Sequence, residues 1–193
     1  MFTKYLHTNI TPLLMLPFHS HTPELQTQNK NNDTFNWDAT SFFEDLTKRN
    51  KFAQSKHFTF CRVSGLDGFE EALAKMLTKT AFVCVSDISQ GFTDINNTPH
   101  TRRVKTVFLA MRHTIDNMVA RQSCMDAMRE LFRQYMSVLI QEQTRLQQHS
   151  IYIDPRISFQ EIDRYFFSGC ACAYFQIAVD TYTDLQYNQE EWT

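Results

Sequence analysis

Three residues near the middle of the chain have side chains suited to proton transfer or phosphate binding. Asp94 and His100 could serve as acid and base, and Arg102 could hold an anion; all three lie in or beside one polar stretch, Ser86–Thr101. Catalysis needs a fixed geometry and a nucleophile or equivalent partner. No nucleophile motif accompanies these residues and nothing in the sequence fixes their geometry, so we interpret the stretch as a solvated loop.

The five cysteines could act as nucleophiles, metal ligands or disulfide partners. Cys170 and Cys172 alternate along a strand-like segment, which puts both thiols on one face, but two further ligands at a suitable spacing are absent. Packing of small side chains in a sheet explains this pair better. An odd number of cysteines in mostly apolar runs is untypical of a secreted disulfide scaffold, so we expect reduced thiols in a cytoplasm-like compartment.

Motifs for nucleotide binding, hydrolysis and zinc-dependent proteolysis are missing together. The sequence contains no G-x-G-x-x-G, no Gly-rich phosphate loop, no G-x-S-x-G and no H-E-x-x-H, and it has only four glycines. We therefore expect no catalytic residues, no cofactor and no metal. The apolar run Ile10–Phe18 is broken by Pro12 and Pro17 and is far shorter than the roughly 20 residues that cross a bilayer, so we expect neither a leader peptide nor a membrane partner.

The charge balance excludes one class of function. With 19 Lys and Arg against 21 Asp and Glu, the net charge of −2 argues against a strongly basic nucleic-acid binder. A short basic stripe, ordinary for a strand that faces water or a subunit boundary, consists of Arg102, Arg103, Lys105 and Arg112. Residues 153–193 hold seven acidic and two basic residues, a net −5, which leaves +3 on residues 1–152. This split either suits head-to-tail association of copies or reflects chance.

The 193 residues, 42% of them hydrophobic, are enough for one domain preceded by an arm. Residues 1–39 form the predicted arm, because the stretch Thr22–Asn36 is polar and has no period that would bury one face. The apolar patches Leu13–Phe18 and Phe35–Trp37 could dock this arm on its own domain or on a neighbouring subunit; a disordered leader is the alternative. Residues 40–193 form the predicted domain.

Hydrophobic periodicity places the elements of this domain. Ser41 and Glu44 predict a capping box, and Asp67 with Glu70 predicts a second capped start. The predicted elements before the polar loop are a helix over Ser41–Asn50, a strand over His57–Val63, a short helix over Leu66–Leu77 and a strand buried on both faces over Ala81–Val85. We interpret Ser86–Thr101 as an irregular polar connection of the kind that is usually functional or disordered.

The second half of the domain is predicted to hold one long helix followed by a hairpin. After a strand over Arg103–His113, a helix of about 30 residues follows over 118–149, capped by Asp116. Its apolar seam repeats every seven residues at Met118, Met125, Phe132, Leu139 and Leu146. Period-two alternation then predicts strands over Ile157–Phe167 and Ala173–Asp180, joined by a turn at Ser168–Gly169. The resulting fold class is α+β: a mainly antiparallel four- to five-stranded sheet packed by one long helix and shorter helices, with an extended N-terminal arm.

In the C-terminal stretch Ala173–Trp192, an amphipathic strand is followed by Asp-Leu-Gln-Tyr-Asn and an acidic end. This stretch and the order of the elements resemble those of the tail-terminator and neck (head-tail joining) proteins of tailed bacteriophages. The resemblance covers about residues 40–192 and is one of organisation. It implies a non-catalytic structural virion protein, assembled in the host cytoplasm, that forms a homo-oligomeric ring. Its partners would be copies of itself and other phage tail or neck proteins, with DNA only passing through the lumen.

Such a ring needs a loop toward its channel and an arm that clasps a neighbour. The residues expected to face the lumen are Asp87, Gln90, Asp94, Asn96, Asn97 and His100. The residues expected to contact a neighbouring subunit are Leu13, Leu14, Phe18, Phe35 and Trp37.

Two other functions remain open at this point. An adaptor protein would use the face of the helix over 118–149 as a docking surface for a partner helix. An enzyme would use a Cys or His nucleophile, with Cys84, Cys124, His100 or His113 as candidates, and would need a thiol of depressed pKa beside a His.

Overall fold

The computed structural model describes residues 37–96, 99–162 and 169–192, and these have the predicted α+β class. The helices are α1 (Ala39–Arg49), α2 (Lys51–Ser55), α3 (Gly65–Lys75), α4 (Met118–Gln147) and the short 3₁₀ helix η2 (Gln189–Glu191). The strands are β1 (Phe58–Val63), β2 (Ala81–Ser86), β3 (Gln90–Asp94), β4 (His100–Arg112), β5 (Ile151–Ile153), β6 (Phe159–Ile162) and β7 (Cys170–Tyr182). Outside the described residues lie Leu13, Leu14, Phe18, Phe35 and Asn97.

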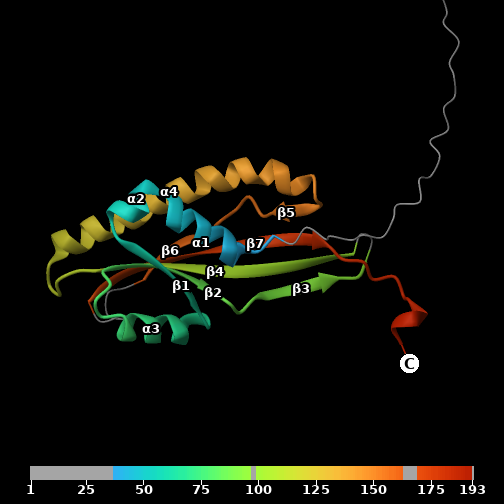
Figure 1. The fold of residues 1–193 in the computed structure, drawn as a ribbon, viewed down its shortest axis with the longest axis horizontal. Coiled ribbons are helices and arrows are strands. Elements are labelled where there is room, and N and C mark those ends of the chain that lie inside the picture. The colour runs from blue at the N-terminus through green and yellow to red at the C-terminus, as the bar shows by residue number, and fades with distance from the viewer. Residues whose placement is uncertain (1–36, 97–98, 163–168, 193) are drawn as a thin grey trace, which may run out of the picture. The chain divides into compact units, whose positions relative to one another are not determined.

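The described strands form a seven-stranded sheet with β4 and β7 at its centre (Figure 1). The order is β1-β2-β4-β7-β5, with β3 paired to β4 and β6 paired to β7. The predicted four to five strands were too few, and the sheet is mixed because β1 and β2 run parallel. The parallel pair follows from the helix α3 between these strands, which carries the chain back to start β2 in the direction of β1.

The polar stretch Ser86–Thr101, predicted as an irregular loop, contains the strand β3. Gln90–Asp94 pairs antiparallel with Val104–His100 of β4. β4 is much longer than β2, which pairs only with Val107–Met111, so the first half of β4 has a free edge that β3 fills. Gly91 permits this pairing, because a Cβ at this position would lie only 1.8 Å from the carbonyl oxygen of Arg102.

We therefore predict that Gly91→Ala separates β3 from β4 and lowers the free energy of unfolding by about 1–3 kcal/mol, the usual cost of forcing extra atoms into a packed contact. Urea unfolding followed by circular dichroism measures this loss, and hydrogen exchange of the β3 amides should become faster. Gly68→Ala is the matched control. Gly68 lies in α3, where a Cβ meets nothing closer than 3.4 Å and alanine favours the helix, so this variant should be no less stable than the original protein. Equal losses in both variants would contradict the prediction.

Helices cover the two faces of the sheet unequally. α1, α2 and α4 lie on one face over the larger core, and α3 lies on the other face over a smaller one (Figure 1). On the α3 side, Phe69 stacks on Phe108 with ring centroids 4.6 Å apart. All six residues of β2 are buried, as predicted for a strand covered on both faces.

The long helix α4 has nearly the predicted bounds and packs through most of the predicted seam. Met125, Leu139 and Leu146 are buried and Phe132 is partly buried. Met118, however, is largely exposed together with its neighbour Val119, because the first turn of the helix lies outside the core.

A buried hydrogen bond joins this helix to α1. The hydroxyls of Tyr135 and Thr47 lie 2.7 Å apart, and Thr47 also donates to the carbonyl of Phe43. Burial raises the pKa of Tyr135, which keeps the phenol neutral and able to donate. The contact links α1 to α4 where both pack on the same face of the sheet.

The predicted helix starts were wrong in detail, because neighbouring residues supply the caps. Asp38 caps α1 by accepting from both the backbone N–H and the hydroxyl of Ser41 at 2.9 Å, and Glu44 instead pairs with Lys48. Asn117, one residue after Asp116, caps α4 by accepting from the N–H of Ala120.

Two further corrections concern the starts of other elements. Ser64 precedes α3 without a side-chain cap, so Asp67 falls within the first turn instead of forming a capping box with Glu70. Asp116 has a left-handed φ of 67° where the chain turns from β4 into α4.

The C-terminal strands combine a confirmed pattern with a missed element. On β7, Ala173, Phe175, Ile177 and Val179 are buried on one face, as the alternation predicts. β6 occupies the start of the predicted strand over 157–167, whose last five residues lie outside the described part. The three-residue strand β5 was not predicted, because it is too short to show a period.

Candidate assembly surface

The three residues first considered for chemistry are brought onto one face of the sheet but are engaged separately. Asp94 and His100 are opposite each other on β3 and β4, and His100 also lies opposite Tyr182 of β7. The ring of Phe92 meets His100 edge-on, with centroids 6.2 Å apart. Arg102 turns instead to two carboxylates from other strands.

Arg102 lies between Asp180 of β7 and Asp154, which follows β5. Its guanidinium donates to Asp180 Oδ2 at 3.2 Å and forms a second ion pair with Asp154. Hydrogen bonding to the backbone of Arg156 and to the Arg102 side chain holds the pKa of Asp154 below its usual value. All three side chains are more than two-thirds buried, so this triad joins β4, β7 and the end of β5.

We predict that Arg102→Leu lowers the free energy of unfolding by about 1–3 kcal/mol at neutral pH, because it leaves two partly buried carboxylates without their cation. A carboxyl group whose pKa is lowered by folding stabilises the fold at pH values above its ordinary pKa, and this stabilisation is lost as the pH falls through the pKa of the folded state. The deficit of the variant should therefore shrink near about pH 3, where carboxyls take up protons.

Urea unfolding at the two pH values measures this difference. Arg103→Leu is the control, because Arg103 is exposed on the opposite side of β4 and should change the stability little. A deficit of the same size at both pH values would contradict the role assigned to Arg102.

The predicted basic stripe is largely occupied within the domain. Lys105 donates to the carbonyl of Asp87 at 2.6 Å, and Arg112 donates to the carbonyls of Lys79 and Leu73. Part of the acidic excess near the C-terminus is likewise neutralised, because Glu161 pairs with Arg129 just as Asp154 and Asp180 pair with Arg102. The charge split is thus smaller at the surface than along the sequence.

The candidate nucleophilic thiols are buried. Cys84 and Cys124 both have a raised pKa; burial is the main cause for Cys124, and the contact with the Cys61 thiol is the main cause for Cys84. This shift is opposite to the activation that a cysteine nucleophile needs. Cys170 and Cys172 share the α3 face, as alternation predicts, and both pack in the smaller core. The described residues include no cluster of three or more His, Cys, Asp or Glu arranged to hold a metal ion.

The predicted lumen residues that are described fall into two groups. Asp87 lies at the base of the hairpin, where it accepts from the hydroxyl of Ser64 at 3.1 Å. Gln90, Asp94 and His100 lie on β3 and β4, and the N–H of Asn96 donates to Asp94 Oδ1 in the turn. Of these residues, Asp94, Asn96 and His100 lie at the far end of the β3–β4 hairpin, whereas Gln90, opposite Val104, lies at its base. Of the predicted arm residues, Trp37 is described; it packs beside Phe42 of α1 with centroids 5.4 Å apart.

On the α3 side, half of the sheet has no described helix above it. α3 covers the end near β1 and β2, while β3 and the adjoining halves of β4 and β7 extend beyond it (Figure 1). We call this surface the open face. Residues that the strand register places on it include Phe92, Asp94, His100, Arg102, Val104, Thr106, Tyr152, Gln176, Asp180 and Tyr182.

Large apolar and aromatic side chains stand out from the open face. Phe92 and Tyr182 are each 56% exposed, and Ile88 and Tyr152 are exposed to a similar degree. A shallow hollow of about 460 Å³ lies between this surface and α3, lined by Leu66, Ile88 and Tyr174 among others. Exposed apolar side chains gathered on one face are typical of a surface that binds another protein.

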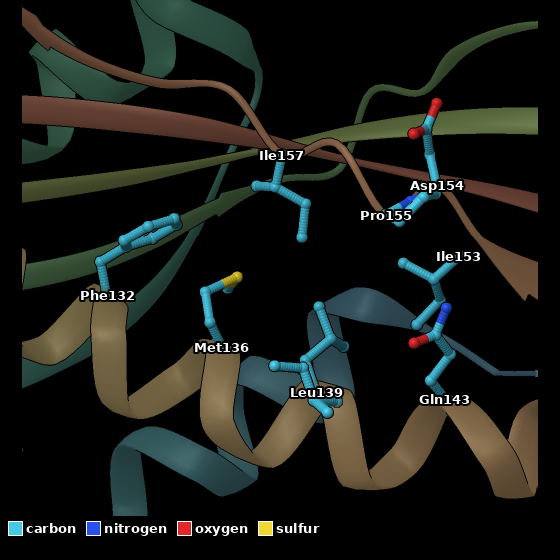
Figure 2. Close-up of a pocket in the computed structure, with 9 residues that line it drawn as sticks. Phe132, Met136, Leu139, Gln143, Ile153, Asp154, Pro155 and Ile157 are labelled. Atoms are coloured by element: carbon cyan, nitrogen blue, oxygen red, sulfur yellow. The ribbon is translucent and has the colours of Figure 1, made fainter.

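A second apolar surface lies on the opposite side of the sheet. It is a groove of about 410 Å³ between α4 and the segment after β5, with Phe132, Met136 and Leu139 on one side and Ile153, Pro155 and Ile157 on the other (Figure 2). Gln143 adds a polar side chain to the groove, whereas the carboxylate of Asp154 points away from α4 (Figure 2) and pairs with Arg102. Ile140 of the helical wall is 69% exposed. We call it the α4 groove. Sequence analysis missed it, because its two walls are joined only in the folded chain.

No protein-family model matches the sequence, and no curated protein matches it significantly. None of the described helices has the length and apolar character needed to cross a membrane.

Proposed function

We propose that the protein is a structural subunit that assembles head-to-tail with copies of itself into a ring, with the open face of one copy covering the α4 groove of the next. The supporting observation is the placement of two exposed apolar surfaces on opposite sides of one sheet. Contacts between unlike surfaces generate rings when the rotation closes, whereas a single self-complementary surface stops at a dimer.

The sheet edge adds to the same argument. No described strand pairs with the outer edge of β3, so its backbone N–H and C=O groups are available to a neighbouring chain. Phe92 on this strand and Ile95 just after it are both exposed. A monomeric protein usually blunts such an edge with charged residues or a bulge.

We propose that this ring belongs to the tail or neck of a virion, because the sequence resembles tail-terminator and neck proteins of tailed bacteriophages. On this proposal the protein acts in the virion, binds other tail or neck proteins and lets DNA pass through its lumen. The polar end of the β3–β4 hairpin, with Asp94, Asn96 and His100, is the part of the predicted lumen loop that fits a wet channel. The function requires contacts between subunits and no catalysis.

Two variants test the head-to-tail contact. Light scattering after size-exclusion chromatography should give a closed oligomer for the original protein and monomers for Phe92→Asp and for Ile140→Asp, because each variant buries a charge in one half of the contact. A 1:1 mixture of the two variants should form a dimer, since each retains the surface that the other has lost. Negative-stain images of the original protein should show rings.

Leu77→Asp is the matched control. Leu77 is also strongly exposed but lies after α3, away from both surfaces, so this variant should assemble like the original protein. A monomeric original protein at high concentration, or variants that still assemble, would contradict the proposal. A mixture that stays monomeric would contradict the head-to-tail contact.

The α4 groove also favours a second candidate function, an adaptor that binds a partner helix. Its position between one helix and one extended segment and its apolar walls are features of grooves that accept amphipathic helices. This alternative predicts a monomer at every concentration, so the same light-scattering measurement separates the two functions.

A further inference from the structure

Two cysteine side chains meet across the parallel strands at the edge of the sheet. Cys61 of β1 and Cys84 of β2 are directly opposite in the strand register, and their Sγ atoms lie 2.7 Å apart. Both are free thiols in this structure. Cys84 is fully buried, whereas Cys61 is only partly covered and can be reached from solvent.

This geometry is close to that of a covalent bond. A disulfide joins sulfurs about 2.05 Å apart and needs Cα atoms about 4.4–6.8 Å apart. Opposite residues on neighbouring strands meet the Cα requirement, because strands lie about 4.8 Å apart. Bond formation therefore needs only small side-chain movements and no shift of either strand.

We infer that Cys61 and Cys84 are a site of oxidative modification at which hydrogen peroxide converts the two thiols into a disulfide. Cys61 reacts first, because it is the accessible member of the pair. Its thiolate sulfur attacks one peroxide oxygen and becomes a sulfenic acid, and the other oxygen leaves as hydroxide and takes up a proton to become water.

The buried partner then completes the reaction. The Cys84 sulfur attacks the sulfenic sulfur, the S–S bond forms, and the hydroxyl leaves with the Cys84 proton as a second water. Two thiols are oxidised by two electrons and one hydrogen peroxide is reduced to two waters. The hydrogen bond from Cys84 lowers the pKa of Cys61, which supports its role as the first thiol to react. Cys84 stays protonated and acts through its position, 2.7 Å from the Cys61 sulfur.

The other cysteines do not offer this geometry. Cys170 and Cys172 are two residues apart on one strand, which separates their Cα atoms by about 7 Å. Cys124 lies on α4, in the core on the opposite side of the sheet, where its thiol faces the carbonyl of Arg112 at 3.7 Å. The site is therefore specific for one pair.

The bond would close a loop that contains the whole of α3 and would fasten the edge strand β1 to the sheet. Reducing the freedom of the unfolded chain raises its free energy relative to the folded state. The oxidised protein should consequently melt several degrees higher than the reduced protein.

Mass spectrometry of the full-length protein tests the assignment. After treatment with a small excess of hydrogen peroxide, denaturation and alkylation, three thiols should react with iodoacetamide instead of five, and non-reducing peptide mapping should find Cys61 linked to Cys84. Dithiothreitol should restore five reactive thiols. Cys61→Ser should keep four reactive thiols and form no internal disulfide, while the control Cys170→Ser should still form the Cys61–Cys84 bond.

Five reactive thiols after peroxide treatment, a bond between another pair, or irreversible sulfinic acid at Cys61 would each overturn the inference. The mapping uses the original protein, so it remains decisive if a variant fails to fold. It is also independent of the oligomeric state, so its outcome does not depend on whether the protein forms rings.

Discussion

The antiparallel pairing of β4 with β7 is the constraint on which the rest of the structure depends. Thirteen consecutive residue pairs join these strands, from His100 opposite Tyr182 to Arg112 opposite Cys170. Every other strand except β1 attaches to an outer edge of this pair: β2 and β3 share the free edge of β4, while β5 and β6 share that of β7. The helices pack where this double strand presents apolar side chains, so both core clusters contain residues from β4 and β7.

The unequal cover of the two faces follows from the length of this central pair. β1 and β2 flank only the second half of β4, and α3, which connects them, covers only that part of the sheet. The first half of β4 extends past them together with β3 and β7, and no described helix covers this part on the α3 side, which leaves aromatic side chains such as Phe92 and Tyr182 exposed. On the other side, α4 packs over β4, β7 and the short β5, and the α4 groove lies between this helix and the segment after β5. One strand length thus explains both apolar surfaces that support the proposed assembly.

The sequence predicted the elements whose side chains repeat with a clear period. The alternation in Ala173–Asp180 and the seven-residue repeat of α4 identified the two longest elements, because burial of one continuous face leaves a regular pattern. β3 was missed since its polar residues face solvent, and β5 since three residues hold no period. The seam of α4 was wrong at Met118 because periodicity does not tell where a core ends.

The candidate surfaces could not be predicted in the same way, since they combine residues that are distant in the sequence. Three strands bring Arg102, Asp154 and Asp180 together. The net charge of residues 153–193 could not show that two of their acidic side chains are paired with this arginine. The contact of Cys61 with Cys84 depends on the register of a parallel pair, which no local pattern encodes. Phe92 lay in the stretch predicted as an irregular loop, and Tyr182 lay beyond the predicted strand Ala173–Asp180, so no local pattern indicated that both stand on one face of the sheet.

The wide sequence separation within the central pair also affects how the chain reaches its folded state. Arg112 and its partner Cys170 are 58 positions apart, and His100 and Tyr182 are 82 positions apart. Contacts this distant make folding slow. During synthesis at about 5–20 residues per second, β4 waits on the order of ten seconds for all of β7 to be made. Throughout that interval one long edge of β4 is unprotected, so pairing with the strand edges of other nascent chains competes with folding.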